Sequence, residues 1–367
     1  MKYIPIFSAA RYRNRTGQST MPSVFMVQRS KNASFMPSSW AFPGGVLEES
    51  DYNIKWAELT RWKTHKPAIL AHLPIYDDQR QVDKRHMPEL ALRICALREL
   101  YEECGVLAVH NIETQQLSCF NLNSTTTTSE NVDIRPSDSI TDAMASLPPE
   151  LIRDCPEKFI EIFASQEKFT PAVSQLCEWS NWLTPISPLH KGRRFDTVFY
   201  TLPVTNEFDY GICINELADA QWLDPLPSLH AAYNNEMKLA PPQIYQLAEI
   251  HAAAVANANV GLSEIARNRI QKNHIHRICP QFWLCDDGVR VSVRYGDSAF
   301  VTENSAFFEP RAFDGTAEQF RNQSKLLHRI EFTGKKGWAD WSSHCSRELK
   351  EKLGICVPEL ELEPAKL

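Results

Sequence analysis

One stretch of the sequence decides the fold: Arg98-Glu99-Leu100-Tyr101-Glu102-Glu103-Cys104-Gly105-Val106. It closes a longer segment whose apolar residues recur at steps of three and four positions: Leu90, Ile94, Leu97, Leu100 and Cys104. This spacing predicts an amphipathic helix over residues 88–104. Gly105 follows at once, and a glycine in this position is typical of the residue that ends a helix.

The same helix would carry three carboxylates on one face, because Glu99 precedes Glu102 and Glu103 by three and four positions. Their mutual repulsion destabilises the helix unless positive charge lies among them. Arg98, four positions before Glu102, offsets part of it through a forked pair. The remaining repulsion among the carboxylates favours the binding of a divalent cation, and oxygen ligands suit Mg²⁺ or Mn²⁺ better than zinc. A solvated acidic face is the alternative interpretation.

Two features upstream of the helix strengthen the interpretation as a functional site. Residues 22–29, PSVFMVQR, form an apolar run that predicts a buried strand. The loop Phe42-Pro43-Gly44-Gly45 follows, with the composition of a backbone that turns tightly. Such a loop could bring backbone amides to a phosphate group, and a divalent cation would neutralise the oxygens of a pyrophosphate.

Residues 98–106 resemble the second half of the Nudix box, G-x5-E-x7-R-E-U-x-E-E-x-G-U with U apolar, and every fixed position of that half matches. The first half is similar to residues 42–51, where Gly45 followed by five residues reaches Asp51 instead of the usual Glu. Residues 52–97 separate the halves, where the standard box has seven residues. An interrupted box resembles the animal peroxisomal Nudix hydrolases that cleave coenzyme A.

The resemblance implies an α/β fold, the Nudix α/β/α sandwich with a mixed sheet, a large insertion in the Nudix box and a C-terminal extension. We expect the hydrolase domain to span residues 1–270. It would include a surface-packed insertion at about 52–90, a flexible loop at about 121–141 and a helical insertion at about 148–184. Residues 271–367 would form the extension, packed on the same domain.

The resemblance also assigns roles to the matched residues. Glu99, Glu102 and Glu103 would hold Mg²⁺ or Mn²⁺, and one of them would act as the base that deprotonates the attacking water. Arg98 would orient a glutamate. Gly45 would let the loop close on the metal, and its carbonyl oxygen would be a further ligand. Asp51 would support the loop through a contact with the helix.

Four residues are expected to bind the substrate: Arg29, Phe42, Gly44 and Gly45. In coenzyme A-cleaving Nudix enzymes, a segment similar to residues 25–30, FMVQRS, precedes an F-P-G-G loop and is associated with the substrate. The match is partial, because Val27 stands where the bacterial and yeast-type signature usually has Thr. A core strand that ends in a surface arginine is an equal alternative for Arg29.

The expected reaction is hydrolysis of the diphosphate of coenzyme A or acyl-coenzyme A, giving 3′,5′-ADP and 4′-phosphopantetheine or its acyl derivative. Water attacks phosphorus, so no nucleophilic side chain is needed. Two alternatives stay open, because the box handles only the shared diphosphate. One is a Nudix hydrolase of another nucleoside diphosphate, such as NADH, ADP-ribose or an RNA cap. The other is a nucleotide-binding Nudix module that does not hydrolyse its ligand.

Composition and termini narrow the partners and the location. The chain has 39 basic and 45 acidic residues, so no global positive field favours a nucleic-acid partner. No apolar run is long enough for a membrane span. The ten cysteines form no CxxC pair, which indicates reduced thiols. The end Ala365-Lys366-Leu367 is similar to the tripeptide that the peroxisomal import receptor binds, so we expect a peroxisomal enzyme.

Two further motifs have weaker functional interpretations. His274, His276 and Cys279 could hold zinc, but their spacing matches no standard site. The favoured interpretation is a partly buried segment that leads into a strand. The basic run at 191–194, KGRR, could meet the 3′-phosphate of coenzyme A, and a solvated turn is an equal alternative.

Overall fold

A computed structural model describes residues 2–12, 22–34, 36–122, 138–186, 194–256, 260–303, 308–334 and 337–345. The C-terminal tripeptide 365–367, most of the expected loop at 121–141 and most of the basic run at 191–194 lie outside these residues. The last residues of that expected loop, from 138 onward, belong to a helix.

The strands are β1 (Lys2–Tyr12), β2 (Pro22–Arg29), β3 (Trp40–Ala41), β4 (Leu107–Asn111), β5 (Leu117–Phe120), β6 (Phe169–Pro171), β7 (Cys177–Leu183), β8 (Phe195–Val204), β9 (Leu217–Leu223), β10 (Arg277–Ile278), β11 (Gln281–Cys285), β12 (Arg290–Val293), β13 (Arg311–Phe313), β14 (His328–Gly334) and β15 (Gly337–Cys345). The α-helices are α1 (Lys55–Leu59), α2 (Trp62–His65), α3 (Pro74–Val82), α4 (Pro88–Cys104), α5 (Asp138–Ser146), α6 (Pro149–Asp154), α7 (Pro225–Tyr233), α8 (Pro241–Ala256), α9 (Leu262–Gln271) and α10 (Ala317–Gln323). Two 3-10 helices are η1 (Glu49–Tyr52) and η2 (Pro156–Phe163).

The central sheet is mixed, as predicted. Its strand order is β10-β7-β8-β1-β2-β3, and β9 also pairs with β2. Strands β1 and β8 run parallel, whereas β7 pairs with β8, and β1 with β2, in antiparallel fashion. A smaller sheet, β5-β4-β6, lies beside the helix α4.

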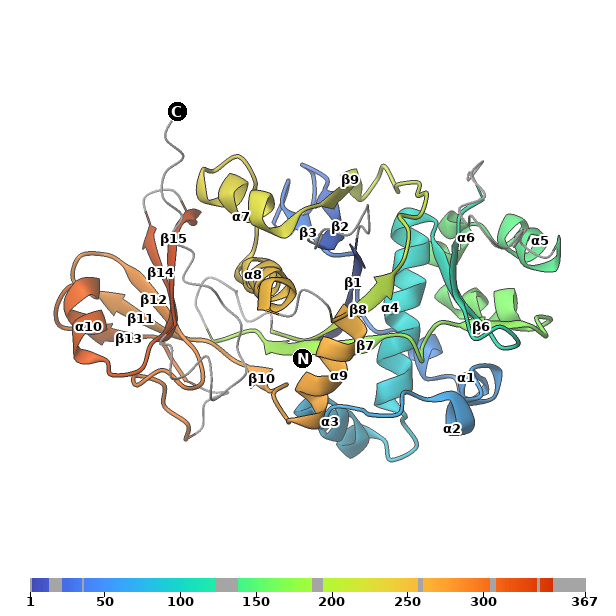
Figure 1. Ribbon diagram of the computed structural model, residues 1–367, viewed down its shortest axis with the longest axis horizontal. Coiled ribbons are helices and arrows are strands. Elements are labelled where there is room, and N and C mark those ends of the chain that lie inside the picture. The colour runs from blue at the N-terminus through green and yellow to red at the C-terminus, as the bar shows by residue number, and fades with distance from the viewer. Residues whose placement is uncertain are drawn as a thin grey trace.

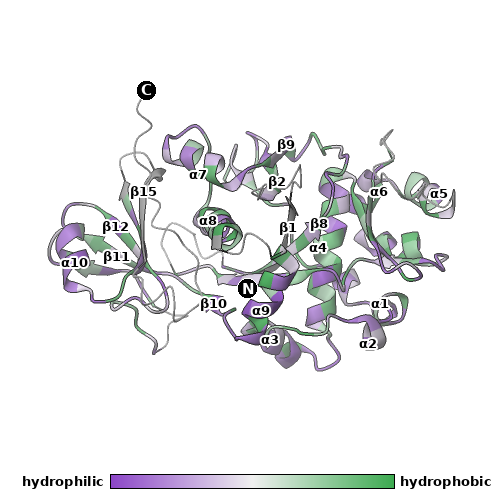
Figure 2. Ribbon diagram, in the orientation of Figure 1, coloured by the Kyte–Doolittle hydropathy of each residue, from purple (hydrophilic) through white to green (hydrophobic). Residues whose placement is uncertain are grey.

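Helices cover both faces of the central sheet, which gives the α/β/α sandwich (Figure 1). On β2, Phe25 and Val27 belong to the buried cluster that contains the apolar side of α4, whereas Val24 and Met26 belong to the cluster of α8. Both faces of this strand are therefore buried, which explains its continuous apolar sequence. Figure 2 shows hydrophobic residues along the inner strand β8, whereas the outlying α10 is largely hydrophilic.

Helix α4 spans Pro88–Cys104, which confirms the helix predicted over 88–104. Pro88 starts it, where the absent N–H costs no hydrogen bond. Gly105 ends it in the left-handed conformation, with φ of 64°, and donates its N–H to the Tyr101 carbonyl at 2.8 Å. The helix is buried nearly all round, because strands lie on one side and the segments at 55–82 and 149–163 lie on the others.

The insertion between the two halves of the box is integrated into the core, not only packed on the surface as expected. It folds as α1, α2 and α3, and its Trp56, Ile75 and Tyr76 are nearly fully buried in the same cluster as α4. The sequence pattern did not predict this burial, because the buried residues are spread over three short helices between charged residues.

The expected helical insertion at 148–184 is helical only in its first half, through α6 and η2. Residues 169–171 and 177–183 are the strands β6 and β7, so the helical interpretation of this part was wrong. In β7 the register shifts between Glu178 and Ser180. This bulge places Trp179 and Trp182 in the same buried cluster, and their spacing of three mimics a helix.

The C-terminal extension forms its own sheet, β13-β11-β12-β14-β15, with α10 beside it at one end of the molecule (Figure 1). Ile330 and Phe332 of β14 join the buried cluster of α8. The Nε2 atom of His328 also lies 3.1 Å from the Tyr245 hydroxyl of α8. These contacts hold the extension against the sandwich. In the described part of the chain, no helix has both the length and the apolar character needed to cross a membrane.

Candidate active site

Two carboxylates of α4 meet the glycine loop that follows β3. The Gly44 N–H donates to Oε2 of Glu103 at 3.0 Å. A Cβ atom built on Gly45 would overlap the carboxylate of Glu99, so only glycine permits this close approach. The loop therefore contacts the helix, as predicted, although the insertion separates the two in sequence.

Arg98 is the centre of an ion-pair network beneath the loop. Its Nε and Nη2 atoms each donate to one oxygen of Asp51 at 3.0 Å, and Nη2 also donates to the Val46 carbonyl at 3.1 Å. Its Nη1 donates to Glu99 at 3.1 Å and to Glu102 at 2.7 Å. The guanidinium, nearly fully buried, thereby fixes the loop, η1 and two carboxylates in one arrangement.

Positive charge does not balance the carboxylates at this site. Burial raises the pKa of Glu99 to about 8, although Arg98 opposes the shift. Burial, followed by the charge of Glu99, raises the pKa of Glu103 well above its ordinary value. Burial likewise raises the pKa of Glu102, against the opposing charge of Arg98. The site therefore favours the binding of further positive charge.

This charge imbalance and the oxygen-only donor set fit the expected Mg²⁺ or Mn²⁺. Glu99 and Glu103 lie against the Gly44-Gly45 loop, whereas Glu102 is held by Arg98. Within the described ranges, no three His, Cys, Asp or Glu side chains converge as a preformed metal site. The residues that would hold the cation are Glu99, Glu103 and the Gly45 carbonyl, with Glu102 joining if it leaves Arg98.

The expected substrate residues divide into two groups. Arg29, at the end of β2, lies close enough for its charge to lower the pKa of Glu103. Gly44 and Gly45 form the loop itself. The Phe42 side chain, in contrast, is buried on the α8 face, where its ring packs edge-on against Phe199 at 6.2 Å. Phe42 thus anchors the loop from below, and its expected contact with substrate is not supported by this position.

The sequence analysis missed the groups that surround the last turn of α4. The Gly211 N–H donates to the Cys104 carbonyl at 3.0 Å, and the Cys213 N–H donates to the Glu103 carbonyl at 2.9 Å. Arg153 of α6 donates from Nη2 to the Glu102 carbonyl at 3.0 Å. The general rule that the last carbonyls of a helix need donors predicts such partners, but nothing in the sequence identifies them.

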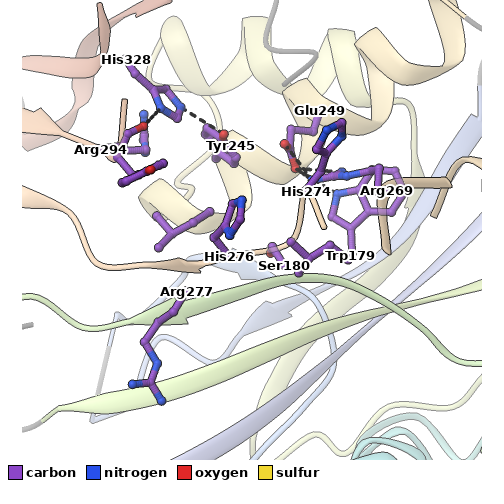
Figure 3. Close-up of a pocket in the computed structure, with 13 residues that line it drawn as sticks. Trp179, Ser180, Tyr245, Glu249, Arg269, His274, His276, Arg277, Arg294 and His328 are labelled. Atoms are coloured by element: carbon purple, nitrogen blue, oxygen red, sulfur yellow. Dashed lines mark hydrogen bonds and ion pairs between the residues drawn. The ribbon is translucent and has the colours of Figure 1, made fainter. Parts of the chain in front are cut away.

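A crevice on the opposite, α8 side of the sheet lies between the sandwich and the C-terminal sheet (Figure 3). Two of its arginines are paired: Arg269 with Glu249 at 3.1 Å and Arg277 with Asp196 at 2.5 Å. His274 and His276 line it, but no cluster of three metal-binding side chains exists among the described residues. The zinc interpretation of this segment therefore lacks structural support.

Comparison with known proteins gives the same family as the box. Residues 6–250 match the family described as the NUDT19 Nudix domain. A Xenopus laevis protein named Acyl-coenzyme A diphosphatase NUDT19 is 27% identical over 338 residues, which are 87% of this chain and 83% of the relative. The Homo sapiens protein of the same name is 26% identical over 337 residues, covering 84% and 80%.

Among solved structures, a NUDIX hydrolase from Alicyclobacillus acidocaldarius aligns with a TM-score of 0.47 at 19% identity, covering 71% of this chain and 96% of that one. The family match spans both halves of the interrupted box and the strands β2 to β9. The chain therefore belongs to the NUDT19 Nudix domain family and is a Nudix hydrolase.

Proposed function

We propose that this protein is a metal-dependent diphosphatase that hydrolyses coenzyme A or acyl-coenzyme A to 3′,5′-ADP and 4′-phosphopantetheine or its acyl derivative. The observation that carries the proposal is the contact of the Gly44-Gly45 loop with Glu99 and Glu103 across the insertion. The names of the relatives from Xenopus laevis and Homo sapiens support the choice of substrate.

The residues of the site suit attack of water on a diphosphate. Arg98 holds Glu99 and Glu102 in place, and the Gly44 N–H holds Glu103, so the carboxylates are oriented before substrate binds. Glu99 or Glu103 accepts the proton of the attacking water. Bound Mg²⁺ or Mn²⁺ would neutralise the phosphate oxygens and these carboxylates.

The test is product analysis on the purified full-length chain with Mg²⁺ or Mn²⁺. The substrates are coenzyme A, an acyl-coenzyme A, NADH, ADP-ribose and capped RNA, with products identified by mass. We expect 3′,5′-ADP from the two coenzyme A substrates and no turnover by Glu103→Gln. Glu113→Gln is the matched control, because Glu113 is an exposed carboxylate that pairs with Lys168. Preferred cleavage of NADH, ADP-ribose or capped RNA would replace the substrate assignment.

A folded protein that binds these nucleotides but cleaves none would instead be a binding module.

For localisation, we propose that the peroxisomal import receptor binds Ala365, Lys366 and Leu367 and that the protein resides in peroxisomes. A fluorescent fusion that leaves this end accessible tests the proposal. The full chain should accumulate in peroxisomes, and removal of the three residues should leave it outside. Equal distribution of the two fusions would refute it.

A further inference from the structure

Arg153 is a cation at the end of the Nudix helix that the reaction chemistry has not used. It lies on α6, and its Nη2 atom donates to the Glu102 carbonyl at 3.0 Å. Burial raises the pKa of the Glu102 carboxyl and the charge of Arg153 opposes this shift, so the guanidinium is close to the carboxylate cluster. The position is therefore part of the active-site rim.

The guanidinium retains hydrogen-bonding capacity. Its Nε atom is buried and has no acceptor among the residues that the structure describes. The Glu216 carboxylate lies 3.9 Å from Nε, which is too far for a hydrogen bond. The Arg153 side chain keeps 22% of its surface exposed, so a ligand can reach part of the side chain although Nε itself is buried. A buried donor without an acceptor is costly and favours an anionic partner.

The negative charge around the loop means that a phosphate-bearing substrate needs a protein cation nearby. The rim and the helix together place Glu99, Glu102, Glu103 and Glu216 around the loop. A substrate that carries several phosphate charges would be repelled by these carboxylates. Divalent cations can offset the charge beside Glu99 and Glu103, but a phosphate farther out needs a protein cation at the rim.

We propose that Arg153 binds a phosphate group of the substrate through those N–H groups of its guanidinium that have no acceptor, while Nη2 stays on the Glu102 carbonyl. This inference rests on the proposed function and deepens it. The guanidinium is a permanently charged donor suited to phosphate oxygens, and the carbonyl contact fixes its orientation. The phosphate is either the 3′-phosphate of the nucleotide half or the diphosphate itself.

A purely structural role is the competing explanation. A cation at the C-terminal end of a helix stabilises the last carbonyls, and Nη2 of Arg153 does so for Glu102. This role explains neither the acceptor-free Nε nor the exposed part of the side chain. The two explanations differ in what they predict for KM, because a helix cap contributes to folding and a phosphate contact contributes to substrate affinity.

The experiment compares Arg153→Met and Arg153→Lys with the full wild-type chain. Lys168→Met is the matched control, because Lys168 is a largely exposed cation that pairs with Glu113. We measure kcat, KM and the unfolding midpoint for each protein with coenzyme A, 3′-dephospho-coenzyme A and ADP-ribose. Binding of 3′,5′-ADP is measured by calorimetry without metal, so that affinity is read independently of turnover.

Arg153→Met should raise KM about tenfold or more, as expected for loss of a hydrogen-bonded charge, with a much smaller change in kcat. Arg153→Lys should recover part of this loss and Lys168→Met should match wild type. A KM effect on coenzyme A alone identifies the 3′-phosphate, and an equal effect on all substrates identifies the diphosphate.

An unchanged KM and unchanged 3′,5′-ADP affinity in a folded Arg153→Met protein would overturn the inference, whatever happens to its unfolding midpoint. If wild type cleaves coenzyme A in that case, the proposed function survives. If wild type cleaves no coenzyme A but cleaves another nucleoside diphosphate with an Arg153-dependent KM, the substrate proposal fails and the arginine inference stands. Wild-type protein that neither cleaves nor binds any of these nucleotides would overturn both.

Discussion

Asp51 and Arg98 stand 47 positions apart in sequence, yet both carboxylate oxygens of Asp51 accept hydrogen bonds from the Arg98 guanidinium at 3.0 Å. Both side chains are nearly fully buried. The pair joins the two halves of the interrupted box, and it does so with Asp where the box usually has Glu. The backbone of η1 compensates for the shorter side chain, because it brings Asp51 directly to the helix.

Replacing Asp51 with Asn should destabilise the protein, because it leaves a buried guanidinium without the carboxylate that binds it through both oxygens. Loss of one partner of a buried ion pair costs about 3–5 kcal/mol, and we expect the lower end because Glu99 and Glu102 still contact Arg98. Urea unfolding measures the change. Asp77→Asn, which removes an exposed partner of Arg80, should cost less than about 1 kcal/mol. Equal losses in the two variants would contradict the assigned role of Asp51.

Replacing Gly45 with Ala should abolish turnover. The added Cβ would overlap the Glu99 carboxylate, so either the loop or Glu99 must move from the position that Arg98 fixes. A displacement of this size at the reacting groups costs about a hundredfold or more in rate. Gly261→Ala is the control, since no other atom lies within 4 Å of the added Cβ there. A Gly45→Ala protein with wild-type kcat and KM would show that the close approach is not required.

Divalent cations should stabilise the wild-type fold in the absence of substrate. Burial, followed by the charge of Glu99, raises the pKa of Glu103, so these carboxylates repel each other until a cation binds. A ligand that binds only the folded state at a hundred times its Kd adds about 2.7 kcal/mol. We therefore expect Mg²⁺ or Mn²⁺ to raise the unfolding midpoint of wild type and EDTA to reverse it. Glu103→Gln should unfold no earlier than metal-free wild type and should respond weakly to metal. A strong response in this variant would place the cation elsewhere.

The residues that sequence could identify are those whose neighbours along the chain determine their environment. The spacing on α4 predicted the helix and its apolar side but not that its polar side is buried too, and the position of Gly105 defined its end. The carboxylates followed from the same spacing, because a helix fixes which side chains share a face. The resemblance to the Nudix box identified the loop that contacts this helix, although the insertion separates the two in sequence.

The residues that sequence could not identify depend on contacts between distant segments. Arg153 reaches Glu102 from another helix, and Phe42 is buried because the loop folds over the α8 face. The bulge in β7 puts Trp179 and Trp182 in one buried cluster, although their spacing of three in the sequence is typical of a helix. Each of these positions follows from the packing of the sandwich, which no local pattern contains.

The insertion should be necessary for stability, because Tyr76 of α3 joins a buried network with the central sheet. Its hydroxyl donates to Glu178 at 3.1 Å, and Arg93 of α4 donates to the same carboxylate oxygen at 2.5 Å. Glu178→Gln removes the only carboxylate that the described residues provide to Arg93, so we expect a loss of about 3–5 kcal/mol in urea unfolding. Tyr76→Phe should cost about 1.5–3 kcal/mol, as for one hydrogen bond to a charged group. A Glu178→Gln protein as stable as wild type would show that the network contributes little.

The attachment of the C-terminal sheet should weaken in acid because His328 is buried in its neutral form. The Tyr295 carbonyl can only accept, so Nδ1 of His328 donates to it at 2.7 Å, and Nε2 accepts from Tyr245 at 3.1 Å. Burial, followed by the charge of Arg294, lowers the pKa of His328 to about 3. The unfolded chain, with a histidine pKa of about 6.5, therefore binds the proton more readily.

Stability contributed by this histidine should be present above about pH 6.5 and should be lost progressively as the pH falls toward 3, by at most about 1.4 kcal/mol per pH unit. His328→Asn keeps an amide donor near the place of Nδ1 but cannot titrate. We expect the difference in unfolding free energy between wild type and this variant to shrink, and then to reverse, as urea unfolding is repeated at lower pH. A difference that stays constant across this range would mean that His328 titrates alike in the folded and unfolded chains, and the buried seam between β14 and α8 would then be open to protons.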